Sequence, residues 1–225
     1  MNIVLRKFVS AGRRLNHLLH PDLIRARCRR RIPQYYSIDG FLSETEALAL
    51  YDLAQSLRKN ASVLEIGVWQ GKSTYCLARG LNDGTITVID PFNADGGGDA
   101  DSEVIYKEIQ REQQLDLLET FQRNLERGKV ASKIKTLRGY SQQFVGSVPA
   151  IDLLFIDGDH SIEGCSFDFE AYQDAVRPGG YLLFHDYDPS RSNFGPTWVI
   201  HNKVLPSGRY KPLKLVESLW IGQRT

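Results

Sequence analysis

Residues 63–73 read VLEIGVWQGKS, and this stretch decides the fold. Val63–Ile66 is a short, mostly apolar run, which is typical of a strand covered on both faces of a parallel sheet. Gly67 and Gly71 follow, and glycine lets the backbone turn tightly and approach a ligand without interference from a Cβ. The next residues, Lys72–Leu81, have a helical pattern. The stretch therefore predicts a strand, a glycine turn and a helix whose first N–H groups point at a bound ligand.

Apolar runs and helical patterns alternate through the rest of the chain, which predicts a parallel sheet with helices on both faces. We expect a Rossmann-like, doubly wound, mostly parallel α/β sheet of seven strands within residues 43–225. The stretch 93–101 contains three consecutive glycines and is predicted as a loop beside the site. The predicted strands lie at about 63–66, 85–89, 133–137, 151–156, 181–184, 209–215 and 218–221. The predicted helices lie at about 44–58, 72–81, 115–125, 161–176 and 197–204.

Composition excludes several protein classes. The 225 residues are 42% apolar and 24% charged, and no run of about 18 apolar residues could cross a membrane. No secretory signal pattern is present. The three cysteines form no CxxC pair, which argues against a disulfide framework or a structural zinc and favours a reducing compartment. We therefore expect a cytoplasmic protein.

Charge is distributed unevenly. Residues 1–31 carry nine Lys/Arg and one acid, a balance of +8, whereas the remainder carries 19 basic and 26 acidic residues, a balance of −7. We define residues 1–42 as a basic, partly helical N-terminal arm. Two interpretations stay open: the arm packs on the acidic body, or residues 1–31 contact an anionic membrane surface through an amphipathic helix. The acidic body argues against a nucleic-acid partner.

Polar residues follow each predicted strand, where ligands bind in open α/β sheets. Asp90 follows the second strand and could accept hydrogen bonds from ribose hydroxyls, although a turn or cap role explains it equally well. Ser141 follows the third strand and could meet an adenine edge or cap a helix. A dinucleotide fingerprint would need glycine where Trp69 stands, which argues against a nicotinamide cofactor.

Two charged clusters follow the fourth and fifth strands. Asp157 and His160 belong to the first cluster, and His185 and Asp186 to the second. Neighbouring strand ends converge, and charges after buried strands are costly unless they are paired or bind a metal. We therefore predict a divalent-cation site formed by Asp157, His185 and Asp186. The alternative is a hydrogen-bonded Asp–His pair that holds the loops together.

These motifs together resemble the class I S-adenosylmethionine (SAM)-dependent methyltransferases. The strings that carry the resemblance are VLEIG at 63–67 with Gly71, Ile89-Asp90, DLLFIDGDH at 152–160 and PGGY at 178–181. The similarity covers about residues 45–190. Within that superfamily the spacing is similar to that of the cation-dependent O-methyltransferases, both the catechol type and the type that acts on sugars of natural products.

The resemblance implies roles for individual residues. Glu65, Gly67 and Ser73 would meet the amino-acid end of SAM, with Gly71 in the same turn. Asp90 would hold the ribose, and Ser141 would lie near the adenine. Asp157 would contact both the cofactor and, with His185 and Asp186, a cation that relatives suggest is Mg²⁺. His185 stands where relatives usually carry Asp or Asn, and imidazole favours softer ions.

The expected activity is therefore methyl transfer from SAM to a hydroxyl of a small molecule, such as a sugar or natural product. A cation lowers the pKa of the acceptor hydroxyl, and His160 takes its proton. One alternative is a metal-dependent oxygenase that uses His160, His185 and Asp186. Another is a non-catalytic SAM-binding module docked through its basic arm. The acceptor, and whether the chain forms a homo-oligomer, stay open.

Overall fold

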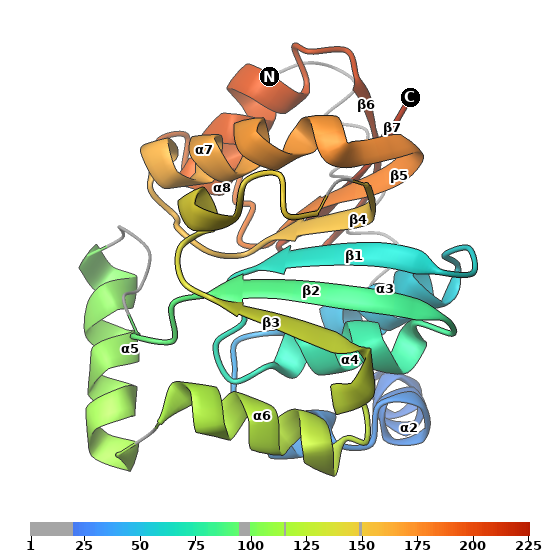
Figure 1. Ribbon diagram of the computed structural model, residues 1–225, viewed down its shortest axis with the longest axis vertical. Helices are drawn as coiled ribbons and strands as arrows, with labels where there is room; N and C mark the ends of the chain where they lie inside the picture. Colours follow the sequence, from blue (N-terminus) through green and yellow to red (C-terminus); the bar gives the residue numbers. More distant parts are fainter. Residues whose placement is uncertain (1–19, 95–99, 115, 149) are drawn as a thin grey trace.

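The computed structural model describes residues 20–225 except 95–99, 115 and 149. It contains seven strands: β1 (Ala61–Ile66), β2 (Gly84–Asp90), β3 (Ile134–Arg138), β4 (Ile151–Ile156), β5 (Val176–Phe184), β6 (Tyr210–Val216) and β7 (Leu219–Arg224). They form one sheet in the order β3-β2-β1-β4-β5-β7-β6 (Figure 1). The first five strands along the chain pair in parallel, and β7 runs antiparallel between β5 and β6. This confirms the predicted Rossmann-like sheet.

The strand order reverses between β1 and β4, and the register aligns the ends of the central strands. Ile66, the last residue of β1, pairs with Ile89 of β2 on one side and with Ile156 of β4 on the other. The chain therefore leaves these three strands at one level. Open α/β sheets bind ligands at such a switch point.

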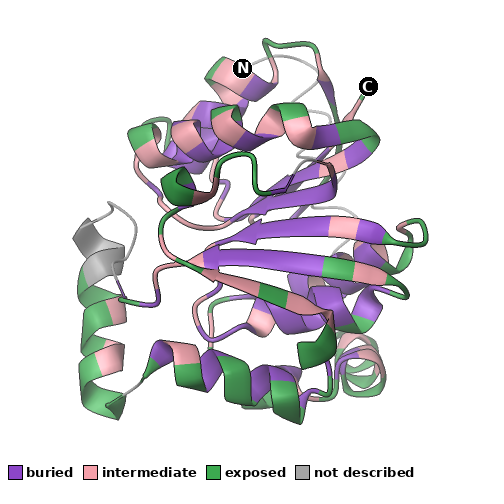
Figure 2. Ribbon diagram, in the orientation of Figure 1, coloured by how far each residue is buried: buried purple, intermediate pink, exposed green. Residues whose placement is uncertain are grey.

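Helices cover both faces of the sheet (Figure 1). Their bounds are α2 (Pro21–Arg31), α3 (Glu44–Gln55), α4 (Lys72–Gly80), α5 (Ala100–Gln113), α6 (Leu117–Arg127), α7 (Ile162–Tyr172) and α8 (Gly195–Val199), the last continued by a π-helical turn at Ile200–Val204. Val63 packs with the cluster that contains α3, α4 and α6, whereas its neighbour Leu64 packs with α7 and α8. Figure 2 shows the central strands buried between these layers. Among the described helices, none has the length and hydropathy needed to cross a bilayer.

The described part of the N-terminal arm packs on the body. Its buried side chains join the same hydrophobic cluster as α3 and α4. Arg27 on α2 forms an ion pair with Asp52 on α3 at 2.6 Å between Nη2 and Oδ2. The packing interpretation therefore holds for this segment, while the amphipathic helix predicted within residues 1–19 lies outside the described residues. The buried arm residues are Cys28, Ile32, Tyr35, Ile38 and Leu42.

Two elements differ from the sequence prediction. Helix α5 begins at Ala100, inside the predicted loop at 93–101. Its Val104 and Ile105 are exposed, so α5 lacks the buried apolar stripe by which amphipathic helices are recognised. Strand β5 begins at Val176 rather than near Tyr181, because residues 177–180 continue the strand through a register shift against β4.

Ile32→Ala tests whether the arm belongs to the body. Ile32 is fully buried, so removing three methyl or methylene groups should lower the free energy of unfolding by about 2–4 kcal/mol. Leu23→Ala on the same segment is the control, because Leu23 is 61% exposed and should change stability by less than about 0.5 kcal/mol. Urea denaturation measures both. Equal effects of the two substitutions would show that the arm does not pack as described.

Candidate functional site

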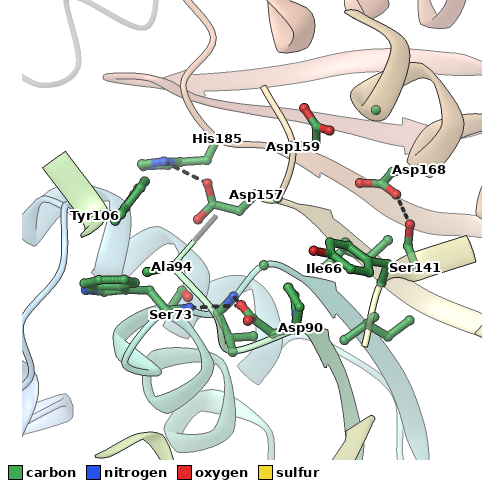
Figure 3. Close-up of a pocket in the computed structure, with 18 of the residues that line it drawn as sticks. Ile66, Ser73, Asp90, Ala94, Tyr106, Ser141, Asp157, Asp159, Asp168 and His185 are labelled. Carbon is green, nitrogen blue, oxygen red and sulfur yellow. Dashed lines mark hydrogen bonds and ion pairs between the residues drawn. The ribbon is translucent and has the colours of Figure 1, made fainter. Parts of the chain in front are cut away.

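A cavity of about 510 Å³ opens at the carboxyl ends of the central strands (Figure 3). Of the predicted site residues, some line this cavity and others lie behind its wall. Glu65, Gly71 and His160 are not part of the lining. The turns after β1 and β2 both border this space. The predicted residues that line it are Gly67, Ser73, Asp90, Ser141, Asp157, His185 and Asp186.

The backbone conformation at position 67 and the close approach of Asp157 require glycine there. The φ of Gly67 is +82°, a region that favours glycine, and a Cβ on it would overlap the carbonyl oxygen of Asp157. The Asp157 N–H donates to the Ile66 carbonyl at 2.8 Å, and the Gly67 N–H donates to the Ile89 carbonyl at 3.0 Å. The turns after β1 and β4 therefore lie against each other, and residues of both turns line the cavity.

Asp90 ties β2 to the turn after β1. Its Oδ2 accepts from the Val68 N–H at 2.8 Å, and its Oδ1 accepts from the Phe92 N–H at 2.6 Å. Burial raises the pKa of Asp90, and these backbone donors oppose the rise. Oδ2 also accepts from the Trp69 N–H at 3.3 Å, so Oδ1, which accepts a single bond, is the oxygen with more capacity for a ligand hydroxyl.

Glu65 supports the site from behind. It is fully buried, and its two oxygens accept from Ser73 Oγ at 2.5 Å and Thr74 Oγ1 at 2.7 Å. Burial raises the pKa of Glu65 to about 8. Glu65 therefore orients the first turn of α4, which presents Ser73 to the cavity. Gly71 caps that helix, and a Cβ there would lie 2.8 Å from the Phe121 ring.

His185 is enclosed by three carboxylates. Its Nδ1 lies 3.3 Å from Asp157 Oδ1 and 3.2 Å from Asp186 Oδ2, and its Nε2 lies 3.5 Å from Glu46 Oε2. Burial would lower the pKa of His185, but the carboxylates outweigh it and raise the pKa well above 6.5. The raised pKa favours the protonated, positively charged form of the buried His185 ring.

Glu46 is a site residue that sequence reasoning missed. Ser43 and Glu46 have the spacing of a capping box, and the structure contains that box at the start of α3. The same carboxylate also accepts from the Ser218 N–H at 2.9 Å and faces His185. Burial would raise the pKa of Glu46, but His185 lowers it to about 2. The capping pattern carried no signal for the second role, because residues 46, 185 and 218 meet only in three dimensions.

Asp157, His160 and Asp186 form a compact donor set. One ligand atom from each lies within 4.8 Å of the others, a spacing suited to a single divalent ion. His160 is buried, and neither ring nitrogen has a hydrogen-bond partner among the described residues, although Nε2 lies 3.3 Å from Asp186 Oδ2. Both nitrogens of His185 face carboxylates. The residues present therefore fit a cation, with His160 as the imidazole of the set; His185 Nε2 also lacks a hydrogen-bond partner among the described residues, but it faces Glu46 at 3.5 Å.

The two ends of the cavity differ in character. At one end, Tyr106 from α5 lies 4.7 Å from Trp69 between ring centroids, close to His185 (Figure 3). At the other end, Ser141 Oγ donates to a carboxylate oxygen of Asp168 on α7. Sequence reasoning missed Tyr106 and Asp168, since the first lies on the unpredicted helix α5. The second stands between two phenylalanines on α7, and a buried acid in that apolar context was the available signal.

Comparison with known proteins identifies one matching family model, described as a methyltransferase domain, over residues 64–187. A curated relative, the uncharacterized protein R132 of Acanthamoeba polyphaga mimivirus, is 38% identical over 66 residues, which is 28% of this chain and 30% of that protein. The chain thus matches less than a third of that relative's length.

Solved structures match over most of the chain. The O-methyltransferase TomG from Streptomyces achromogenes, in complex with SAM, has a TM-score of 0.57 at 18% identity, covering 98% of both chains. An O-methyltransferase from Bacillus cereus, in complex with S-adenosylhomocysteine (SAH), has a TM-score of 0.58 at 16% identity, covering 98% of this chain and 99% of that one. The O-methyltransferase NovP has a TM-score of 0.62 at 17% identity over 81% of each chain. At these identities the likeness shows the fold.

Glu46→Gln tests the buried His185–Glu46 pair through pH. His185 has a raised pKa, so its contribution to stability is complete below about pH 6.5 and is lost as pH rises through the folded value. Glu46 has a lowered pKa, so its contribution is present above about pH 4.5 and is lost as pH falls towards 2. Between about pH 4.5 and pH 6.5, where both contributions are complete, the free energy of unfolding of the variant should be about 1–3 kcal/mol lower than that of the wild type. The difference should be smaller at lower and at higher pH. Urea denaturation across pH measures the loss.

Glu119→Gln is the matched control, because Glu119 is exposed on α6 and should show little loss at any pH. A loss for Glu46→Gln that stays constant from pH 3 to pH 9 would contradict the charged pair.

Proposed function

The chain belongs to the methyltransferase-domain family, and on that premise we propose that it transfers a methyl group from SAM to a hydroxyl of a small molecule. The observation that carries the proposal is the shared cavity of Gly67 and Asp90 at the switch point of the sheet. The start of α4 borders the same cavity, so its free N–H groups and positive dipole end favour a carboxylate there.

The cavity lining supports one orientation of the cofactor. Lys72 and Ser73 stand at the start of α4 and suit the amino-acid end. Asp90 suits the ribose hydroxyls, because an acid at this position accepts hydrogen bonds from both. Ser141 lies beyond it and suits the adenine. The sulfonium would then lie towards Asp157, where a negative surface favours the positive sulfur.

SAM supplies an electrophilic methyl carbon, which an oxygen attacks in line with the carbon–sulfur bond. The residues of this chain align the two reactants and remove a proton from the acceptor. Asp157 and Asp186 lie where the acceptor hydroxyl would approach, and His160 lies beside Asp186. A divalent cation, expected to be Mg²⁺, would lower the pKa of that hydroxyl when bound, and Asp157, Asp186 and His160 would hold it.

His160 has two proposed roles that experiment can separate. As a third metal ligand it contributes to cation affinity. As the general base it takes the acceptor proton, and its replacement leaves cation affinity unchanged. The oxygenase alternative has less support, because the two nitrogens of His185 face carboxylates and leave one imidazole for a metal.

Asp90→Asn tests cofactor binding. The amide keeps the shape of the side chain but replaces an acceptor oxygen by a donor, so affinity for SAH should fall about tenfold to a hundredfold. Isothermal titration calorimetry measures the dissociation constants. Asp83→Asn is the control, because Asp83 is exposed at the opposite end of β2 and should bind SAH as the wild type does. Failure of the wild-type protein to bind SAH would remove the proposal.

Asp186→Asn tests the cation site. The wild-type protein should bind one Mn²⁺ or Mg²⁺ ion, and the variant should bind it about tenfold more weakly, because a charged oxygen ligand is lost. Mn²⁺ titration followed by electron paramagnetic resonance measures free ion. Glu163→Gln, which changes an exposed acid at the start of α7, is the control.

The His160→Ala variant separates the two roles of His160. A loss of Mn²⁺ affinity similar to that of Asp186→Asn would assign His160 as a ligand, and an unchanged affinity would favour its role as the general base. A wild-type protein without cation affinity would contradict the metal-assisted mechanism.

A further inference from the structure

Asp168 on α7 presents a carboxylate oxygen to the cavity. The residue is only 3% exposed, yet it is part of the cavity lining. One oxygen, Oδ1, accepts from Ser141 Oγ, and no other hydrogen bond to Asp168 is found among the described residues. Buried carboxylates normally have their oxygens satisfied. The second oxygen therefore has capacity for a donor that the described residues do not provide.

Gly158 leaves space in front of that oxygen. A Cβ on Gly158 would lie 3.6 Å from Asp168 Oδ2 and 3.3 Å from Ile66 Cγ2. The absence of a side chain thus keeps a gap between a carboxylate oxygen and an apolar surface. Gly158, Ile66 and Asp168 all line the cavity. A flat ring that carries a hydrogen-bond donor on its edge fits the gap between the Asp168 carboxylate oxygen and the apolar Ile66 side chain.

The position of Asp168 corresponds to the base of the cofactor. Figure 3 shows Asp168 and Ser141 at one end of the cavity, His185 and Tyr106 at the other, and Asp90 nearer the middle. If Asp90 holds the ribose, the purine extends towards Ser141. The Tyr172 hydroxyl donates to the Ser141 carbonyl at 2.7 Å, which fixes that loop to α7. Two hydrogen bonds, one from Ser141 to Asp168 and one from Tyr172 to Ser141, therefore join the Ser141 segment to α7.

We propose that Asp168 Oδ2 accepts a hydrogen bond from the 6-amino group of the cofactor's adenine, and so selects adenine over a 6-oxopurine. This inference rests on the proposed function, because it assumes that the nucleoside occupies this cavity. An ionised carboxylate only accepts hydrogen bonds. Adenine offers it an amino donor, whereas hypoxanthine offers a carbonyl oxygen at the same position, and two acceptors repel.

The electrostatics of Asp168 agree with a missing donor. Burial raises its pKa to about 7, Asp159 adds to the rise, and the Ser141 hydrogen bond opposes it. A donor at Oδ2 would favour the charged form and return the pKa towards its ordinary value. The 6-amino group of the adenine would thus supply the hydrogen-bond donor that Asp168 Oδ2 lacks among the described residues.

The test compares two ligands that differ only at the purine 6-position. Calorimetric titration of the wild-type protein at pH 8 with SAH and with S-inosylhomocysteine should give about tenfold or more weaker binding of the inosyl compound. Asp168→Asn should reduce or reverse this preference, because the amide donates to the 6-oxo group. A loss of general packing would weaken both ligands alike. Glu170→Gln on the same helix removes one charge from an exposed side chain and should keep the wild-type preference.

The outcomes separate the inference from the proposed function. Equal affinity of the wild-type protein for both compounds would overturn the role of Asp168 while SAH binding still supports the function. A folded Asp168→Asn variant with an unchanged preference would also overturn it. Absence of binding of either compound to the wild-type protein would remove the proposed function and the inference with it. The wild-type comparison decides the question even where Asp168→Asn does not fold.

Discussion

The backbone contact between Gly67 and Asp157 is the constraint on which the site depends. The register places the ends of β1 and β4 at one level, and no Cβ fits between the two turns that follow. Because the turns meet there, α4 starts on one side and the acidic loop after β4 lies on the other. The cavity that borders both is therefore a product of strand order and one missing side chain. Asp90 then links the β1 turn to β2 through backbone hydrogen bonds.

The charges around the cavity are mostly negative. Among the described residues, five aspartates line it, at positions 90, 157, 159, 168 and 186, against the basic side chains Lys72 and His185. A concave surface of one charge attracts ligands of the opposite charge. A sulfonium and a divalent ion both match this surface. The buried His185 cation offsets part of the charge, since Asp157, Asp186 and Glu46 surround it and would repel one another without it.

Most of the fold could be predicted from the sequence, because its central strands are mostly apolar runs separated by turns and helical patterns. That the residues following the parallel strands lie near one another could be predicted as well, since parallel strands end at one edge of the sheet. Contacts between side chains far apart in the sequence could not be predicted. The contact of Glu46 with His185 joins residues far apart in the chain, and local patterns carry no information on it. Asp168 and helix α5 were missed for a related reason: a single buried acid and an exposed helix each lack a periodic signal.

A crystal structure of the protein with SAH would show where the cofactor lies. The ribose hydroxyls should lie within hydrogen-bond distance of the Asp90 carboxylate, with the adenine towards Ser141 and the sulfur towards Asp157. A nucleoside bound outside the cavity, or inside it with the sulfur towards Ser141, would refute this mode of binding.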